Sequence, residues 1–379
     1  MADEGARRAV TVTDRAAEAD APGGPRPMAR VRGRGAASNA AGRFERHGRE
    51  SCDDGWAQDD DLPPLRTEVA EERVGRILTR NASPDLSFDR SVNPYRGCEH
   101  GCIYCFARPS HAYLGLSPGL DFETKLTVKP GAAAALRREL SARGYAPATI
   151  AIGTNTDPYQ PVERERRVMR GCLEVLSEFR HPVGIVTKGT LVTRDADLLG
   201  EMGQAGLARV GISLTTLDAG LARSMEPRVP APAHRLRAIE RLAAAGVPVR
   251  VCLAPVIPGL TDHEIEALLG QAAEAGATSA SFAVLRLPRE VAGLFRAWLA
   301  EARPDRAARV MARVREVHGG KDYDAAWGRR LAGQGAHAGL LRQRFRLACA
   351  RLGLAERVPP LRTDLFAVPP RPGDQLSLF

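Results

Sequence analysis

The chain has 379 residues and a formal net charge of +9, and it contains no run of about 18 apolar residues that would cross a bilayer. Its first residues are rich in Asp, Arg and Ala and lack the apolar core of a signal peptide, which excludes a secreted or membrane-spanning protein and predicts a soluble cytoplasmic one. Three of the seven cysteines lie within eight residues, which fits a metal site in a reducing compartment better than a disulfide framework.

Residues 1–65 hold few large apolar side chains, and an acidic patch runs from Asp53 to Asp61. Such a composition buries too little apolar surface to offset the conformational entropy that ordering costs. We therefore expect a disordered N-terminal arm.

Residues 66–290 alternate between short apolar runs and amphipathic segments, which is typical of parallel strands covered by helices. A first strand ends near Asn93, and later strands are predicted at Thr149 to Asn155, Pro182 to Lys188, Arg209 to Thr215, Pro248 to Pro255 and Ser279 to Leu287. Helices are predicted at Gly131 to Arg143, Arg164 to Arg180, Ala196 to Ala205, Ala233 to Ala245 and His263 to Ala275. About six strand–helix units predict an α/β fold, a partial (β/α)6 TIM-like barrel with its chemistry at the C-terminal ends of the strands.

Residues 291–362 are predicted to form a helical C-terminal extension, followed by a Pro-rich tail over residues 363–379. From Arg286 to the end there are 18 basic and 9 acidic residues, so this segment carries the whole positive excess. Such asymmetry is typical of a surface that binds nucleic acid, although a solvated Arg-rich helical face is an equal alternative.

Cys98, Cys102 and Cys105 follow the first predicted strand, at spacings that let a compact loop wrap around one cubane cluster. A [4Fe–4S] cluster usually takes four thiolates, so three leave one iron open to another ligand. A zinc site that uses His100 as the fourth ligand is an alternative, but zinc ligands usually come from separated segments. Buried inert cysteines are a second alternative, and His100 is expected to face solvent.

The pattern Cys98-x3-Cys102-x2-Cys105, with Tyr104 before the last cysteine, resembles the signature of the radical S-adenosylmethionine (SAM) superfamily. From Arg90 to Leu287 the chain is most similar to the branch that contains spore photoproduct lyase and its uncharacterised relatives. The resemblance implies that the open iron binds SAM, that Tyr104 packs near the adenine, and that reductive cleavage releases a 5′-deoxyadenosyl radical. It also implies an electron donor such as flavodoxin or ferredoxin.

Polar residues at the other strand ends complete the predicted cofactor site. Thr154 and Asn155 have groups that reach a ribose or an amino-acid group, although an ordinary turn capped by Asp157 is an alternative. By resemblance Lys188 meets the carboxylate of SAM, and Ser213 is a further candidate for the same ligand. Cys172 and Cys252 lie within a predicted helix and strand and are expected in the core. Glu226 and Arg235 are interpreted as framing the substrate mouth or as a plain salt bridge.

The chain departs from photoproduct lyase where that enzyme carries its hydrogen-donating cysteine. The matching stretch, from Ala151 to Thr156, has no cysteine, and Phe106 stands where a tyrosine would complete the relay. A different hydrogen donor or reaction is therefore expected.

The last five residues resemble the bacterial sliding-clamp-binding motif, with Gln375, Leu376, Leu378 and Phe379 as the contacting residues. Folding back onto the protein's own surface is the alternative.

Three hypotheses follow from these observations. The first is a radical SAM enzyme that acts on nucleic acid in DNA repair or modification, with a lyase-like reaction. The second is the same chemistry on a small molecule or protein. The third is a non-catalytic iron–sulfur or zinc protein that binds nucleic acid.

Overall fold

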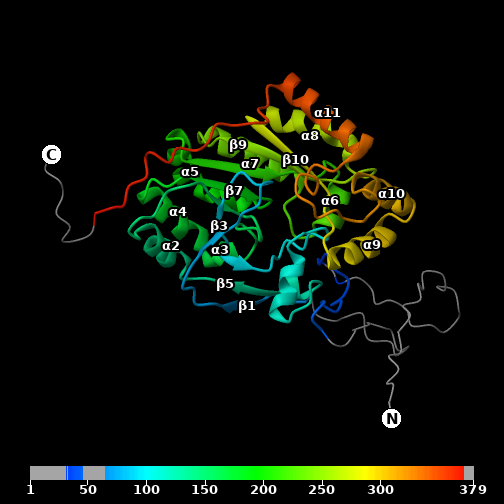
Figure 1. The fold of residues 1–379 in the computed structure, drawn as a ribbon, viewed down its shortest axis with the longest axis horizontal. Coiled ribbons are helices and arrows are strands. Elements are labelled where there is room, and N and C mark those ends of the chain that lie inside the picture. The colour runs from blue at the N-terminus through cyan, green and yellow to red at the C-terminus, as the bar shows by residue number, and fades with distance from the viewer. Residues whose placement is uncertain (1–30, 32, 46–64, 371–379) are drawn as a thin grey trace, which may run out of the picture.

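The structure is a computed structural model that describes residues 31, 33–45 and 65–370. Its centre is a seven-stranded sheet in the order β10-β9-β8-β7-β6-β3-β2 (Figure 1). Six strands run parallel, and β2 pairs antiparallel with β3 at one edge. The strands are β2 (Leu78–Arg80), β3 (Arg90–Val92), β6 (Ile150–Ile152), β7 (Val183–Thr187), β8 (Ala208–Ser213), β9 (Val249–Val256) and β10 (Ser279–Val284). The predicted α/β fold with six parallel strands is confirmed.

Helices follow the parallel strands and cover the outer face of the sheet (Figure 1). They are α2 (Ala132–Leu140), α3 (Glu163–Arg166), α4 (Val168–Glu178), α5 (Ala196–Gln204), α7 (Pro232–Ala244) and α8 (Ile265–Glu274), with the 3-10 turns η2 (Thr190–Asp195) and η3 (Asp262–Glu264). The glycines that follow α5, α7 and α8 all have positive φ, which closes each helix with a left-handed residue before the next strand.

The two faces of the sheet differ. Alternate strand residues such as Ile152, Ile185 and Val210 are buried against the helices in one large apolar core, and full burial of each such side chain contributes about 1.5–3 kcal/mol. The residues between them point to the other face, which we call the lumenal face. Residues that pair across neighbouring parallel strands share a face, as Ser213 and Cys252 do.

The predicted helix from Arg164 to Arg180 is instead two helices, because Arg167 adopts a left-handed conformation with φ of 49°. The buried carboxylate of Glu163 accepts hydrogen bonds from the backbone N–H groups of Val168 (3.0 Å) and Met169 (3.2 Å). These bonds cap the start of α4 and end α3.

A smaller sheet in the order β1-β5-β4 lies beside the main one and holds the cysteine segment. Its strands are β1 (Glu68–Glu71), β4 (Tyr95–Arg96) and β5 (Lys125–Val128). The cysteine segment leaves β4 and continues into η1 (Arg108–Leu114) and α1 (Asp121–Thr124).

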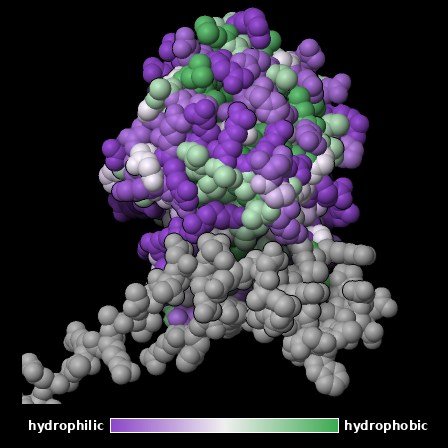
Figure 2. All heavy atoms as spheres, turned by 90° about the vertical axis from the view of Figure 1, so that its right-hand side faces the viewer, coloured by the Kyte–Doolittle hydropathy of each residue, from purple (hydrophilic) through white to green (hydrophobic). Residues whose placement is uncertain are grey.

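The predicted C-terminal extension contains α9 (Glu290–Ala302), α10 (Ala307–Val317) and α11 (Gly335–Leu352). With α6 (Ala219–Met225), α9 and α10 enclose a second apolar core that reaches Cys102, Ile103 and Tyr104. The outer surface on this side is mostly hydrophilic (Figure 2). No helix in the described part of the chain is both long and apolar enough to span a bilayer.

The first residues of the predicted Pro-rich tail pack onto the sheet domain. The ring of Phe366 lies 5.5 Å from the rings of Tyr145 and His181, and Ala367 donates its N–H to the carbonyl of Phe179 (3.1 Å). The chain is therefore anchored up to residue 367, because Phe366 packs against the rings of Tyr145 and His181. The clamp-like motif from Gln375 to Phe379 lies outside the described residues.

Candidate active site

The cysteine loop spans Gly97 to Cys105 at the C-terminal edge of the main sheet. Gly97 and Gly101 have φ values of 74° and 67°, which side chains rarely adopt, so these glycines allow the loop to turn sharply between the thiols. Cys98 and Cys102 are buried and Cys105 is half-buried, and all three thiols are free. The sequence therefore places three thiols in one tight loop, as predicted.

The side chain of Arg108 binds the backbone of this loop. Its buried guanidinium donates to the carbonyl oxygens of Cys102 (2.9 Å) and Gly101 (3.1 Å) and forms an ion pair with the buried carboxylate of Glu123. Neither Arg108 nor Glu123 was predicted from the sequence. The sequence feature that points to Arg108 is its position three residues after Cys105.

The prediction of a disordered arm over residues 1–65 is corrected for residues 33–45, which pack against the rest of the protein. Of the other residues before Leu65, only Val31 is among the described residues. Gly35 and Ala36 donate their N–H groups to the carboxylate of Glu123, at 2.8 and 2.9 Å. Arg34 is 2% exposed and donates to the Glu123 carbonyl at 2.9 Å. Polar backbone contacts, which composition does not reveal, hold this segment against the loop (Figure 1).

The buried thiols of the cysteine loop would need a positively charged group nearby to become thiolates. Burial raises the pKa of Cys98 well above its usual value, and nearby Asp157, Cys102 and Cys105 raise it further. Burial also raises the pKa of Cys102, although Lys188 opposes that change. Iron would supply the positive charge that stabilises the thiolates. Among the described residues no three His, Cys, Asp or Glu side chains surround a single metal-ion position, and a cubane does not require this because each thiolate binds its own iron.

Tyr104 lies at the centre of a buried polar network. Its hydroxyl donates to the carboxylate of Glu226 and lies 3.2 Å from the Thr215 hydroxyl. Glu226 forms a buried ion pair with Arg235 (2.8 Å). Burial alone would raise the pKa of Glu226, but Arg235 and Lys188 lower it below its usual value. Of the two interpretations of Glu226 and Arg235, the salt bridge is the one observed.

His100 does not face solvent, and that expectation was wrong. It is 2% exposed, and its Nδ1 lies 3.3 Å from Oδ2 of Asp157. Asp157 also accepts hydrogen bonds from the Thr187 hydroxyl (2.5 Å) and the Lys188 N–H (2.7 Å). Burial would raise the pKa of Asp157, but His100 and these hydrogen bonds lower it to about 2. Asp157 thus ties the cysteine loop to the end of β7, a role beyond the turn cap that the sequence suggested.

Lys188 and Ser213 lie at the ends of the neighbouring strands β7 and β8. The Nζ atom of Lys188 stands 5.8 Å from the centre of the Tyr104 ring. Ser213 is 4% exposed and pairs in register with Cys252. The position of Lys188 brings it close to Tyr104 of the cysteine loop.

Cys252 is buried, as expected. It lies on the lumenal face of the sheet, because it shares that face with Ser213 and Ser281. Strands buried on both faces carry apolar residues at every position, so the sequence pattern does not indicate which face a cysteine takes. Cys172 is fully buried in the helix-side core, as expected.

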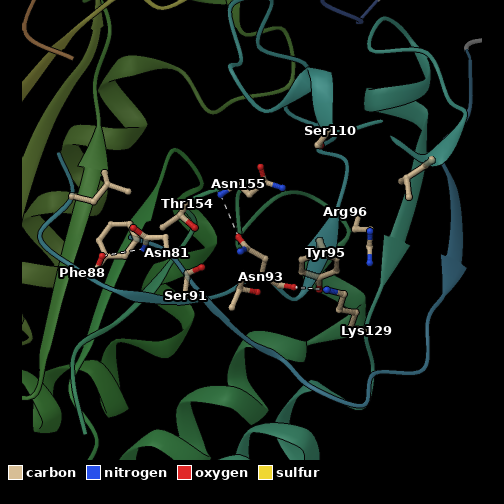
Figure 3. A pocket seen from close by; sticks show the side chains of 13 residues that line it. Asn81, Phe88, Ser91, Asn93, Tyr95, Arg96, Ser110, Lys129, Thr154 and Asn155 are labelled. Atoms are coloured by element: carbon tan, nitrogen blue, oxygen red, sulfur yellow. Dashed lines mark hydrogen bonds between the residues drawn. The ribbon is translucent and has the colours of Figure 1, made fainter. Parts of the chain in front are cut away.

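Thr154 and Asn155 belong to a separate part of the site. They line a polar cavity of about 440 Å³ that also involves Asn93, Ser110 and Lys129 (Figure 3). Asn155 donates its N–H to the side-chain oxygen of Asn93 at 3.2 Å. Neither Lys188 nor Ser213 lines this cavity, so the structure divides the predicted cofactor-binding residues into two groups.

Comparisons with known proteins agree with this geometry. The profile of the family described as the Radical SAM superfamily matches residues 92–272. An uncharacterized protein of Mycobacterium tuberculosis (strain ATCC 25618 / H37Rv) is 43% identical over 235 residues, which are 62% of this chain and 68% of the relative. An uncharacterized protein of Methanocaldococcus jannaschii is 25% identical over 180 residues, 48% of this chain and 64% of the relative.

Among solved structures, spore photoproduct lyase complexed with dinucleoside spore photoproduct matches with a TM-score of 0.55 at 17% identity. The match covers 76% of this chain and 81% of that chain. At this level of identity the match shows a shared fold.

Proposed function

The chain belongs to the radical SAM superfamily, and from this we propose that Cys98, Cys102 and Cys105 bind its cluster and that its substrate is DNA. Members of the superfamily are enzymes that use a [4Fe–4S] cluster and SAM, and these are the cofactors of this protein. The observation that supports the cysteine assignment is the single tight loop of three free thiols at the C-terminal edge of a parallel sheet.

The residues around the loop have distinct proposed roles. When bound, the cluster supplies the electron that cleaves SAM and so generates the 5′-deoxyadenosyl radical. Arg108 fixes the loop backbone through two carbonyls, and Tyr104 packs against the cofactor with its hydroxyl held by Glu226. The charge of Lys188 would pair with the carboxylate of SAM, and Ser213 would add a hydrogen bond.

We assign Thr154 and Asn155 to the same cofactor. They lie at the end of β6, where a hydroxyl and an amide in the cavity wall would reach a ribose. The cavity is within the range of known ligand sites, which are roughly 300–1,000 Å³.

Two observations support action on DNA, in repair or modification. The segment from Arg286 onward carries 18 basic and 9 acidic residues, and an excess of basic residues attracts phosphates. The similar lyase structure holds a dinucleoside photoproduct. A lyase-like reaction with a donor other than a β6 cysteine is the form we propose, because β6 and its flanking residues carry no cysteine. A small-molecule or protein substrate is the alternative.

Anaerobic reconstitution tests the cysteine assignment. The intact protein, loaded with iron and sulfide and then reduced, should show [4Fe–4S] absorption and release 5′-deoxyadenosine from SAM. Replacing any one of Cys98, Cys102 and Cys105 by alanine should abolish both signals. Cys172→Ala is the matched control, since this buried thiol lies in α4 among apolar side chains. If the fully loaded, reduced protein cleaves no SAM, the proposal is wrong.

Two partners complete the proposal. A low-potential donor such as flavodoxin or ferredoxin would reduce the cluster. A bacterial sliding clamp would bind Gln375, Leu376, Leu378 and Phe379, which would deliver the enzyme to DNA.

A further inference from the structure

Three exposed aromatic side chains lie in segments that adjoin the cysteine loop. Phe44, Phe106 and Tyr113 are 58%, 43% and 68% exposed, and we call them the aromatic platform. Phe106 directly follows Cys105, Tyr113 lies in η1, and Phe44 comes from the docked N-terminal segment. The rings of Phe44 and Tyr113 are 5.3 Å apart. Exposed aromatic rings that gather in one place usually mark a binding surface.

Arginines are interleaved with these rings. The Arg43 guanidinium lies 4.7 Å from the ring centres of both Phe44 and Tyr113, and the Arg286 guanidinium lies 4.0 Å from the centre of Phe106. Arg43 and Arg289 lie near the Tyr113 hydroxyl and lower its pKa.

The surface carries a net positive charge. Arg43 is neutralised by Glu290 at 3.0 Å. Within the described residues, the ion pairs involve neither Arg286 nor Arg289. Two arginines beside exposed rings therefore favour an anionic partner.

Backbone strain occurs at the same place. Arg289 has φ of 54° and ψ of −122°, which a side chain-bearing residue rarely adopts. Such strain is retained where the surrounding structure enforces it, and it is often found at binding sites. Here it positions an arginine at the edge of the aromatic platform.

The aromatic platform and the cavity share the short helix η1. Tyr113 shares the short helix η1 with Ser110 and Leu114, and both of these line the cavity wall.

We propose that the aromatic platform binds single-stranded DNA, with bases stacked on Phe44, Phe106 and Tyr113 and a phosphate on the exposed Arg289. Bases stack on aromatic side chains without regard to sequence, and arginines follow the phosphate backbone in proteins that bind single strands. A protein partner would also use aromatic residues, but the unpaired positive charge and the adjoining polar cavity favour a polyanion. This inference rests on the proposed action on DNA, and it names the surface that holds the substrate.

Fluorescence anisotropy with a labelled single-stranded oligodeoxynucleotide tests it on the reconstituted full chain. Tyr113→Ala and Phe44→Ala should each weaken binding about tenfold. Tyr113→Phe should retain binding, because the ring remains. Leu347→Ala is the matched control, since this side chain is 64% exposed on α11, away from the platform.

The salt dependence of binding separates phosphate contacts from stacking. Arg289→Ala should reduce the slope of log affinity against log salt by roughly 0.7. Arg241→Ala on α7, outside the basic C-terminal segment, should leave the slope unchanged. Equal DNA binding by the intact protein and the platform variants would overturn the inference, and so would tighter binding of an RNA or an acidic peptide than of DNA.

These results are distinguishable from failure of the proposed function. SAM cleavage without substrate depends on the cysteine loop, so the Tyr113 and Phe44 variants should release 5′-deoxyadenosine at the rate of the intact protein. If the protein binds DNA through the aromatic platform but cleaves no SAM, the proposed enzymatic function is wrong and the proposed DNA-binding surface is supported.

Discussion

Gly35 and Gly101 meet so closely that a Cβ atom on Gly35 would lie 1.8 Å from the carbonyl oxygen of Gly101. The N-terminal segment and the cysteine loop therefore touch through backbone atoms. Glu123 joins them further, since it binds the N–H groups of Gly35 and Ala36 and pairs with Arg108.

Gly35→Ala should push the N-terminal segment off the cysteine loop. The added methyl group cannot fit against backbone, so we expect the free energy of unfolding to fall by about 1–3 kcal/mol. The cluster should also be lost faster in air. Denaturant unfolding and the decay of visible absorption measure these effects. Gly75→Ala is the control, because its Cβ would meet no atom within 4 Å. Unchanged stability in the Gly35 variant would contradict the contact.

Lys188→Met should weaken SAM binding without preventing cluster assembly. Losing a charged hydrogen bond to the carboxylate is expected to raise the dissociation constant roughly 10- to 100-fold. Equilibrium dialysis with labelled SAM on the loaded protein measures this. Lys321→Met is the matched control, since Lys321 is exposed and does not line the cavity. Equal affinity in the Lys188 variant and the intact protein would remove Lys188 from the cofactor site.

Arg235→Leu should destabilise the fold strongly. It leaves the Glu226 carboxylate buried without its partner, which is expected to cost about 3–5 kcal/mol, whereas the double variant Arg235→Leu/Glu226→Leu should regain most of that loss. Denaturant unfolding of the two single variants and the double variant measures their coupling. Additive effects would show that the two side chains do not interact.

Acid should destabilise the region where the C-terminal segment docks. Burial lowers the pKa of His181 from 6.5 to about 4, so the native state holds it neutral while the unfolded chain binds a proton at higher pH. The free energy of unfolding should therefore be fully supported above pH 6.5 and fall as the pH drops towards 4, by about 3 kcal/mol at most. Unfolding measured across this range tests it. His181→Asn should flatten the slope, and the same slope in that variant would assign the effect to other groups.

Deleting residues Gln375 to Phe379 should abolish binding to a bacterial sliding clamp while SAM cleavage remains intact. Surface plasmon resonance with immobilised clamp measures binding, and 5′-deoxyadenosine release serves as the control for folding. Clamp binding that survives the deletion, or is absent from the intact chain, would reject the motif.

Local features were predictable from the amino-acid sequence. The three cysteines lie within eight residues, so their spacing alone determines a loop that can surround one cluster. The alternation of apolar runs and helices predicted six parallel strands, because hydrophobic periodicity is a property of neighbouring residues. Lys188 was placed at a strand end by the same reasoning.

Contacts between distant segments were decided by the tertiary structure alone. His100 meets Asp157, Arg34 meets Glu123, and Arg286 meets Phe106. Such pairs depend on the register between strands, because the register sets which segments lie side by side. A strand that is apolar on both faces has no alternating pattern from which its register or facing could be predicted. The sequence by itself therefore determined the cysteine loop and the parallel sheet, while only the folded chain determined the network that holds the loop and the surface beside it.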